Sequence, residues 1–150
     1  MSFRNYQVPY EINEQFKKKA AYFSMEFAIH QPLKIYSGGL GFLAGSHLRS
    51  AFELNQNLIG VGILWKYGYY DQARNQDQTL QVTFMEKMYS FLEDTGIKYQ
   101  ILIHDHPVWV KVHYLAPNTF CSAPLFLLST DLPENDYVSQ TITHLSLIHI

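Results

Sequence analysis

The sequence has a single cysteine, Cys121, among 150 residues, so no disulfide can form within the chain. Low cysteine usage is typical of reducing compartments, and the cytoplasm is therefore the predicted location. The neighbours of Cys121 include no group that would activate a thiol. We expect this side chain to be packed rather than reactive.

Positive charge and long apolar runs are also scarce. The net charge is −2, and Lys17–Lys19 is the only basic run, which we expect to be a solvated helix end. Nucleic acid is therefore not a predicted partner. No apolar run reaches the length of a membrane span, and Met1–Asn5 lacks the apolar core of a signal peptide. A membrane is not a predicted partner either.

Apolar residues are plentiful enough for a folded core. Hydrophobic residues make up 47% of the chain and charged residues 16%, which excludes a disordered protein. The length fits one domain. Aromatic residues reach 15%, which suits a sugar-stacking surface or a packed core, and composition alone favours the core.

The first half of the chain predicts an α/β fold. Periodicity indicates a helix over 9–19, a strand over 20–27, a loop over 28–37, a helix over 41–55 and a strand over 58–64. Both strands are almost continuously apolar, as expected of strands buried on both faces. Two glycines in the second strand indicate close packing against another element. The strand–helix–strand order argues for a mostly parallel sheet.

The second half predicts antiparallel β-structure after about residue 96. Alternating residues indicate a hairpin with strands over 98–104 and 108–115 and a turn at 105–107. A third strand over 123–129 ends at a capped acidic loop over 130–136. The patterns between the two halves give a turn at 75–78, a strand-like run at 79–84 and a possible helix at 86–94.

The stretch Tyr36–Gly45 is the most informative part of the chain. It has three glycines within four residues, followed at once by the helix over 41–55. Such a turn at a helix N-terminus presents unpaired N–H groups and the positive end of the helix dipole. We therefore expect it to bind a phosphate or a sugar. The expected apolar face of the helix consists of Phe42, Leu43, His47, Leu48, Ala51, Phe52 and Leu54.

Two nucleotide-binding motifs fit this stretch poorly. Residues 39–44 match the G-x-G-x-x-A form of the dinucleotide fingerprint, but the preceding strand is too short and no acidic residue ends the next strand. No Lys-Ser/Thr pair follows the glycines, so a P-loop is excluded. A serine nucleophile elbow is also absent from the sequence.

Other polar residues could form sites only in combination. His104 and His106 alternate on a predicted strand, but no third metal ligand is implied, so we expect surface residues and no metal. Glu26 lies inside an apolar strand and is either a structural partner or part of a site. It could form a glycosidase-like carboxylate pair with Asp71 or Asp131, although sequence spacing gives no separation to test.

Several ordered motifs together resemble the N-terminal region of the α-glucan (glycogen/starch/maltodextrin) phosphorylases. These motifs are residues 21–27, 37–41 with Leu43 and Ala44, 60–72, 91–96, 107–111 and 128–136. The resemblance runs from about Ala20 to His144 and is strongest to the shorter bacterial type. It implies an incomplete N-terminal Rossmann-like half of a GT-B fold.

The resemblance also implies an activity. Such enzymes use inorganic phosphate to remove the terminal glucose of an α-1,4-glucan, releasing glucose 1-phosphate with retained configuration. Pyridoxal 5′-phosphate is held by a lysine of the C-terminal half, and its phosphate exchanges a proton with the substrate phosphate. By motif, the loop near the substrate phosphate and the terminal glucose would consist of Gly38, Gly39, Leu40 and Gly41. Tyr22 and Glu26 would lie near the cofactor.

Two departures from the family pattern affect these expectations. No lysine of this chain sits in the cofactor motif, so residues 1–144 correspond to an N-terminal domain fragment that we expect to be inactive alone and marginally stable. The parent enzyme could be a homo-oligomer. Residues 145–150 do not resemble the family continuation, and we expect them to be an unrelated tail after a truncation.

Two other functions remain as alternatives. A glycogen or starch synthase also carries a Gly-Gly-Leu-Gly loop in a GT-B domain, but lysine and aspartate typically flank that loop, where this chain has Ser37 and Phe42. A non-catalytic carbohydrate-binding domain would fit the abundant aromatic residues and the missing half.

Overall fold

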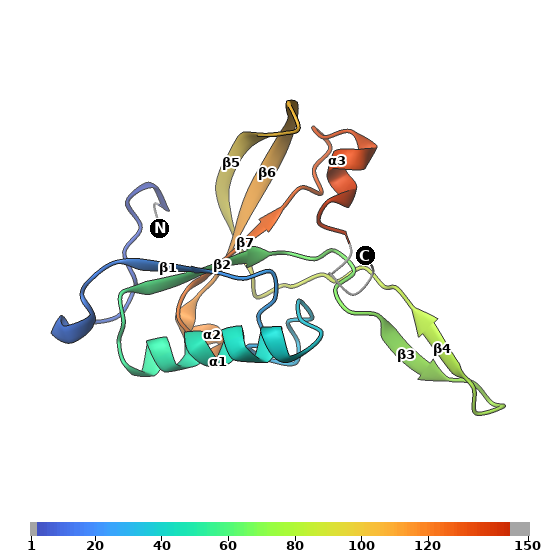
Figure 1. The fold of residues 1–150 in the computed structure, drawn as a ribbon, viewed down its shortest axis with the longest axis horizontal. Coiled ribbons are helices and arrows are strands. Elements are labelled where there is room, and N and C mark those ends of the chain that lie inside the picture. Colours follow the sequence, from blue (N-terminus) through green and yellow to red (C-terminus); the bar gives the residue numbers. More distant parts are fainter. Residues whose placement is uncertain (1–2, 145–150) are drawn as a thin grey trace.

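The computed structural model describes residues 3–144, which form an α/β fold around a five-stranded mixed sheet (Figure 1). The strand order is β1-β2-β7-β6-β5. The parallel strands are β1 (Ala20–Phe23), β2 (Leu58–Ile63) and β7 (Leu125–Ser129). The antiparallel strands are β6 (His106–Leu115) and β5 (Glu93–Ile103). The predicted α/β class is confirmed. Strand β7 was expected in the antiparallel portion, but it runs parallel to β2 and antiparallel to β6.

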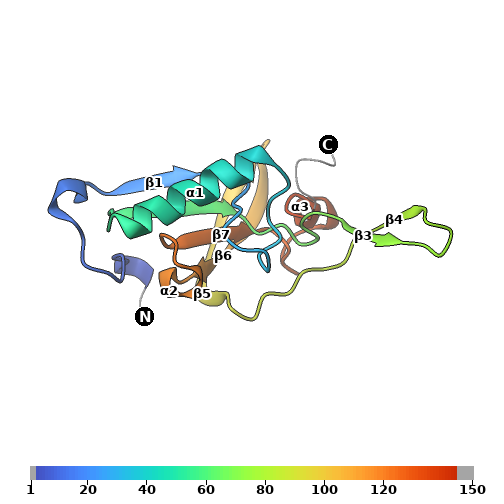
Figure 2. The ribbon, with the colours of Figure 1, turned by 90° about the horizontal axis from the view of Figure 1, so that it is seen from below.

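Helix α1 (Gly39–Glu53) connects β1 to β2 and lies against one face of the sheet (Figures 1 and 2). The predicted close approach to β2 is confirmed, because a Cβ atom on Gly60 would lie 2.8 Å from Leu48 Cδ1 and 2.9 Å from Leu125 Cδ1. Leu48 and Leu125 belong to the main hydrophobic core, which therefore lies between α1 and the sheet.

Strand β1 is not buried on both faces as predicted. Within residues 3–144 it pairs only with β2 and forms one edge of the sheet. The Phe23 side chain is 73% exposed, and Ala20 and Ala21 are exposed too. The apolar run was misleading because α1 covers only one side of this strand.

The predicted hairpin after residue 96 is confirmed, but its turn lies one position earlier. Ile103 pairs with His106, which leaves His104 and Asp105 as the two turn residues. Their φ angles of 49° and 63° are typical of a two-residue β-hairpin turn. His106 therefore belongs to the strand rather than to the turn.

A second, smaller hairpin projects from the end of the sheet (Figures 1 and 2). It consists of β3 (Asp71–Arg74) and β4 (Leu80–Thr83), joined by the predicted turn at 75–78. The Asn75 amide donates to the Thr79 carbonyl at 2.9 Å and closes this turn. The possible helix at 86–94 is wrong, because this segment has no helical turn and leads into β5.

The helix predicted over 9–19 is also wrong. Only Glu14–Phe16 form a single 3₁₀ turn, and Tyr10 instead bonds the distant Gln56 carbonyl through its hydroxyl at 2.8 Å. The rest of the segment has bends but no helix, and Lys17–Lys19 are exposed as expected although they do not end a helix. A further 3₁₀ turn spans Phe3–Asn5.

Two short helices complete the described structure. Helix α2 (Pro117–Phe120) ends at Cys121, which has a left-handed φ of 52° and an exposed side chain. The packed thiol was therefore a wrong prediction. Helix α3 (Tyr137–Thr141) is capped by Asp136, whose side chain accepts from the Ser139 amide at 2.8 Å, as expected for the acidic loop. Between residues 3 and 144, the chain forms no helix of the length and apolarity that crossing a membrane requires.

Candidate functional site

The glycine turn leads directly into α1 and leaves its first amides free. Gly38 is the N-cap and has no side chain to cap the helix. The Phe42 amide donates to the Gly38 carbonyl at 3.2 Å, but the earlier amides of Gly39, Leu40 and Gly41 have no acceptor in the described part of the chain. Together with the helix dipole, these three N–H groups can receive an anion or a sugar hydroxyl.

The glycines of this turn have two different reasons to be glycine. Added Cβ atoms on Gly38 and Gly39 would meet nothing within 4 Å, so these positions face open space. A Cβ on Gly41 would lie 2.6 Å from Tyr36 Cβ, and one on Gly45 would overlap the Ala28 carbonyl. None of these glycines needs a positive φ. The first pair leaves the helix start accessible, and the second pair lets α1 pack closely.

Glu26 fixes the approach to the turn. Its side chain is 3% exposed, and it accepts two hydrogen bonds from Ser37, at 3.1 Å from the amide and 2.6 Å from the hydroxyl. Ser24 holds the backbone of Glu26 by donating from its hydroxyl to the Glu26 carbonyl at 2.9 Å. The structure thus makes Glu26 a structural partner of the glycine turn.

Tyr22 lies on a different side of this arrangement. Its ring packs against His47 of α1, with ring centroids 4.8 Å apart, and against Phe27 at 6.0 Å. Glu26 therefore contacts the turn, whereas Tyr22 contacts the body of the helix. Of the sequence-predicted site residues, the structure joins Glu26 to residues 37–41 and does not bring Tyr22 into that contact set.

Exposed apolar side chains surround the helix start, which the sequence analysis missed. Leu40, Phe42 and Leu43 are 51%, 59% and 66% exposed. Phe42, Leu43, His47 and Leu54 were assigned to the apolar face and are exposed, whereas Leu48 and Ala51 of the same predicted face are buried. The helix contacts the sheet through Ala44, Leu48 and Ala51, whereas Leu40, Phe42 and Leu43 lie on its exposed side.

A hollow of about 420 Å³ lies beside the turn. The Tyr36 and Phe42 rings, 5.5 Å apart in a T-shaped arrangement, form part of its lining. Ser46 and Arg49 add polar groups, and the Arg49 guanidinium donates to the Ile29 carbonyl. Aromatic rings next to hydroxyl and guanidinium groups suit a sugar, because rings stack on its apolar face and polar groups bond its hydroxyls.

A second polar cluster follows the carboxyl ends of β2 and β7. Lys66 Nζ lies 2.9 Å from Asp131 Oδ2 and 3.9 Å from Glu86, while His144 Nε2 lies 3.3 Å from Asp131 Oδ1. Burial opposes ionisation of Asp131, but the hydrogen bonds from Lys66 and His144 outweigh it and lower the pKa of this carboxyl group. Lys66, Glu86 and Asp131 therefore pair with one another within this cluster.

The possible carboxylate pair is not assembled by shared contacts. Glu26 is occupied by Ser37, and Asp71 forms an ion pair with Lys87. Asp131 belongs to the separate cluster with Lys66. Each carboxyl group therefore has its own partner on a different element.

His104 and His106 are both exposed, as predicted. His106 Nε2 lies 2.6 Å from Asp136 Oδ2, which links the hairpin to the cap of α3. Among residues 3–144, no group of three or more histidine, cysteine, aspartate or glutamate side chains is arranged to hold a metal ion.

Comparisons with known proteins place this geometry in context. No family model matches the chain. An uncharacterised protein of Methanocaldococcus jannaschii is 56% identical over 127 residues, which cover 85% of this chain. A glycogen phosphorylase of Mycobacterium tuberculosis is 36% identical over 82% of the chain, and a maltodextrin phosphorylase of Thermococcus litoralis is 31% identical over 93%. The chain is homologous to phosphorylases.

These relatives are much longer than the region they share with the chain. The chain spans 24% of the M. jannaschii protein, 15% of the M. tuberculosis enzyme and 18% of the T. litoralis enzyme. The homology therefore supports a phosphorylase-related origin for most of the chain. The tail predicted at 145–150 lies outside the described residues.

Proposed function

We propose that this chain forms the N-terminal part of an α-1,4-glucan phosphorylase with a GT-B fold. The free amides of Gly39, Leu40 and Gly41 carry the proposal, because they offer anion donors at the position where the sequence resembles the phosphorylase glycine loop. The homology to glycogen and maltodextrin phosphorylases supports it. The parent enzyme would act in the cytoplasm on glucan and inorganic phosphate.

The residues of this chain would bind and orient the substrate. The amides at the start of α1 would hold the attacking phosphate, and Tyr36 and Phe42 would contact the sugar chain from the neighbouring hollow. Glu26 would act as a positioning residue, since its bonds to Ser37 fix where the first amide points. Preorganised donors of this kind stabilise charge without reorganisation during the reaction.

The implied cofactor fits this chain only as a neighbour. When bound, pyridoxal 5′-phosphate supplies a phosphate group for proton exchange with the substrate phosphate. The described contacts of the site are backbone amides, a carboxyl group already bonded to Ser37, and the Tyr22 ring packed on His47. None of these is an amine that could hold an aldehyde covalently. We infer that its lysine belongs to another part of the parent enzyme.

The test is a chimera in which residues 20–144 replace the homologous segment of the M. tuberculosis glycogen phosphorylase. Gly39→Pro removes one amide donor, while proline is tolerated at the first position of a helix. The chimera should retain activity in the phosphorolysis of maltoheptaose. The kcat/KM for phosphate should fall about 100-fold in Gly39→Pro, as when one preorganised donor is lost.

Gly39→Ala is the matched control. An added Cβ meets nothing within 4 Å there, and the amide remains, so activity should stay near that of the unsubstituted chimera. Equal activity of the proline and alanine variants would contradict a role for this amide. A chimera that folds but releases no glucose 1-phosphate would contradict the proposed function itself.

A further inference from the structure

The face of the sheet opposite α1 is apolar and largely uncovered. Side chains alternate along β2, so that Leu58 is buried on the α1 side while Ile59, Val61 and Ile63 lie half-buried on the other. Register places Phe23 beside Val61 on this open face. Phe23 is 73% exposed and lies on β1, the edge strand next to β2.

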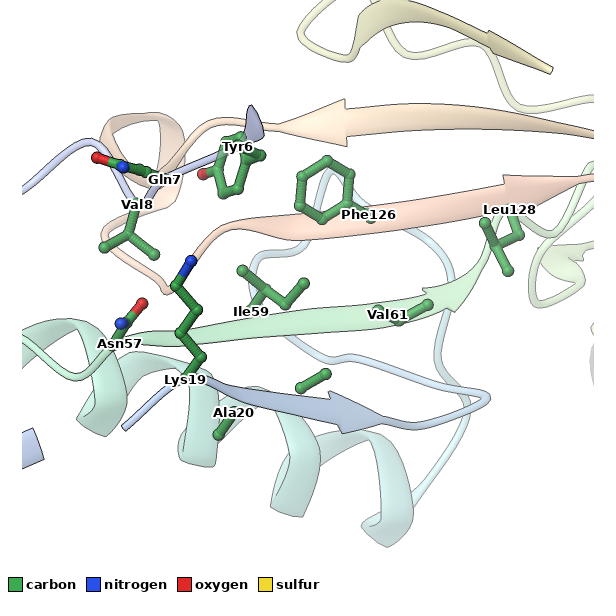
Figure 3. Close-up of a pocket in the computed structure, with 11 residues that line it drawn as sticks. Tyr6, Gln7, Val8, Lys19, Ala20, Asn57, Ile59, Val61, Phe126 and Leu128 are labelled. Atoms are coloured by element: carbon green, nitrogen blue, oxygen red, sulfur yellow. The ribbon is translucent and has the colours of Figure 1, made fainter. Parts of the chain in front are cut away.

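The N-terminal segment covers only one end of the open face. Figure 3 shows Tyr6 next to Phe126 and Val8 farther from it, beside Gln7, while Val61 and Leu128 lie farther along the strands. The Tyr6 ring meets the Phe126 ring edge-on at 5.0 Å. The rest of the face is not covered in this way.

Two adjoining hollows mark the uncovered area. One, of about 530 Å³, is lined by the N-terminal segment together with Ile59 and Phe126. The other, of about 260 Å³, is lined by Phe23 and Ile63. Both share Val61 and Leu128. Parallel strands are normally covered on both faces, because their connections place helices there. An apolar face of this kind requires an apolar partner.

The strand order indicates what covers it. The step from β1 through α1 to β2 places a helix on one face. Crossovers between parallel strands are right-handed, so a later strand that joins beside β1 would send its connecting helix across the opposite face. A strand that joins beside β5 would send its helix across the α1 face. Only a strand that joins beside β1 would place its connecting helix on the open face. Within residues 3–144, β1 is an edge strand, so its outer side is unpaired there.

We propose that the open face of β1, β2 and β7 is the docking surface for an amphipathic helix of the longer parent polypeptide, followed by a strand that pairs with β1. The chain spans only 15–24% of the relatives reported above, which leaves ample polypeptide to supply both elements. This surface is separate from the glycine turn. The inference concerns assembly and does not depend on the reaction.

The test compares the chain alone with a chimera in which residues 18–144 replace the homologous segment of the M. jannaschii protein. Amide exchange in β1 should be at least tenfold slower in the chimera, because new strand pairing protects its free edge. Phe23→Ser should lower the unfolding temperature of the chimera and leave that of the chain alone unchanged, since Phe23 is exposed there. Leu102→Ser, at a 70% exposed position of β5, should change neither the unfolding temperature of the chimera nor that of the chain alone.

Three outcomes would overturn the proposal. Equal exchange rates for β1 in both proteins would show that its edge stays open. Equal effects of Phe23→Ser and Leu102→Ser in the chimera would show that the face has no apolar partner. A dimer of the chain alone that already protects β1, and that Phe23→Ser dissociates, would assign the face to a second copy. Because no outcome is read from phosphorolysis, failure here is distinct from failure of the proposed function.

Discussion

Glu26 and Ser37 are joined by two hydrogen bonds, from the Ser37 amide at 3.1 Å and from the Ser37 hydroxyl at 2.6 Å. The first residue follows β1 and the second precedes α1, so the pair closes the loop between them. This link sets the direction from which the chain enters the glycine turn. Because Glu26 is buried, breaking the pair leaves polar groups without water.

Replacing Glu26 by glutamine tests this link. Its amide NH₂ group can no longer accept, so one of the two Ser37 donors loses its partner. We expect Glu26→Gln to lower the free energy of unfolding by about 1–3 kcal/mol, measured by urea denaturation. The exposed Glu11 provides the control, and Glu11→Gln should change it by less than about 0.5 kcal/mol.

A double-mutant cycle separates the pair from its surroundings. Ser37→Ala removes only the hydroxyl. Its effect on the free energy of unfolding should therefore be much smaller when Glu26 is already replaced by glutamine. Additive effects of Glu26→Gln and Ser37→Ala would show that the two side chains act independently, contrary to the geometry.

Alanine substitutions should rank the glycines by packing. Gly39→Ala should be neutral or slightly stabilising, because the added Cβ meets open space at the start of a helix. Gly41→Ala should lower the free energy of unfolding by about 1–3 kcal/mol, since its Cβ would lie 2.6 Å from Tyr36 Cβ. Gly45→Ala should cost at least as much, because the obstacle there is the Ala28 carbonyl. Thermal and urea unfolding give the order, and a Gly39→Ala variant as unstable as Gly45→Ala would contradict it.

The sequence predicts the parallel part of the fold well, because its signals are local. A continuous apolar run indicates β2, and the 3.6-residue period indicates α1. The run at 123–129 predicted a strand, but its parallel pairing with β2 was not predicted. The sequence does not predict which face of β2 is covered by a helix. Ile59, Val61 and Ile63 are apolar although they lie away from α1, so alternation gives no sign of the open face.

The site was predictable in part. Glycine spacing located the turn, but the accessible position Gly39 and the packed position Gly41 look alike in sequence. The partner of Glu26 lies eleven residues later, across a loop without a periodic pattern, so only the folded chain reveals it. Phe42 was wrongly assigned to the buried face, because apolar side chains lie on both the buried and the exposed side of α1 and apolar periodicity does not separate the two.

The Lys66–Asp131 ion pair should make stability depend on pH at both extremes. The pKa of Asp131 is lowered in the folded state, so its contribution is present above the ordinary value of 3.8 and is lost as the pH falls below it. Hydrogen bonding to Asp131 outweighs burial and raises the pKa of Lys66 above 10.5, so that contribution is lost as the pH rises through the raised value. Between these limits the pair should stabilise the fold.

Asp131→Asn measures this contribution. We expect this substitution to lower the free energy of unfolding by about 1–2 kcal/mol at pH 7 and by less below pH 4. Urea unfolding across pH 3–9 measures it. Glu53→Gln, at an exposed position near the end of α1, should show no such pattern. A loss from Asp131→Asn that stays constant down to pH 3 would show that the carboxylate charge is not responsible.

The Tyr6 hydroxyl should anchor the N-terminal segment to the sheet. It lies 3.0 Å from the Tyr114 hydroxyl, and burial, followed by this hydrogen bond, raises the pKa of Tyr6 well above 10. A raised pKa favours the folded state below pH 10, and this contribution falls as unfolded tyrosine ionises above that pH. Tyr6→Phe should therefore cost about 1 kcal/mol at pH 7 and show a shallower loss of stability from pH 9 to 11. Tyr137→Phe, at a 79% exposed position, is the matched control. Equal urea midpoints for both variants at pH 7 would show that this hydroxyl does not dock the segment.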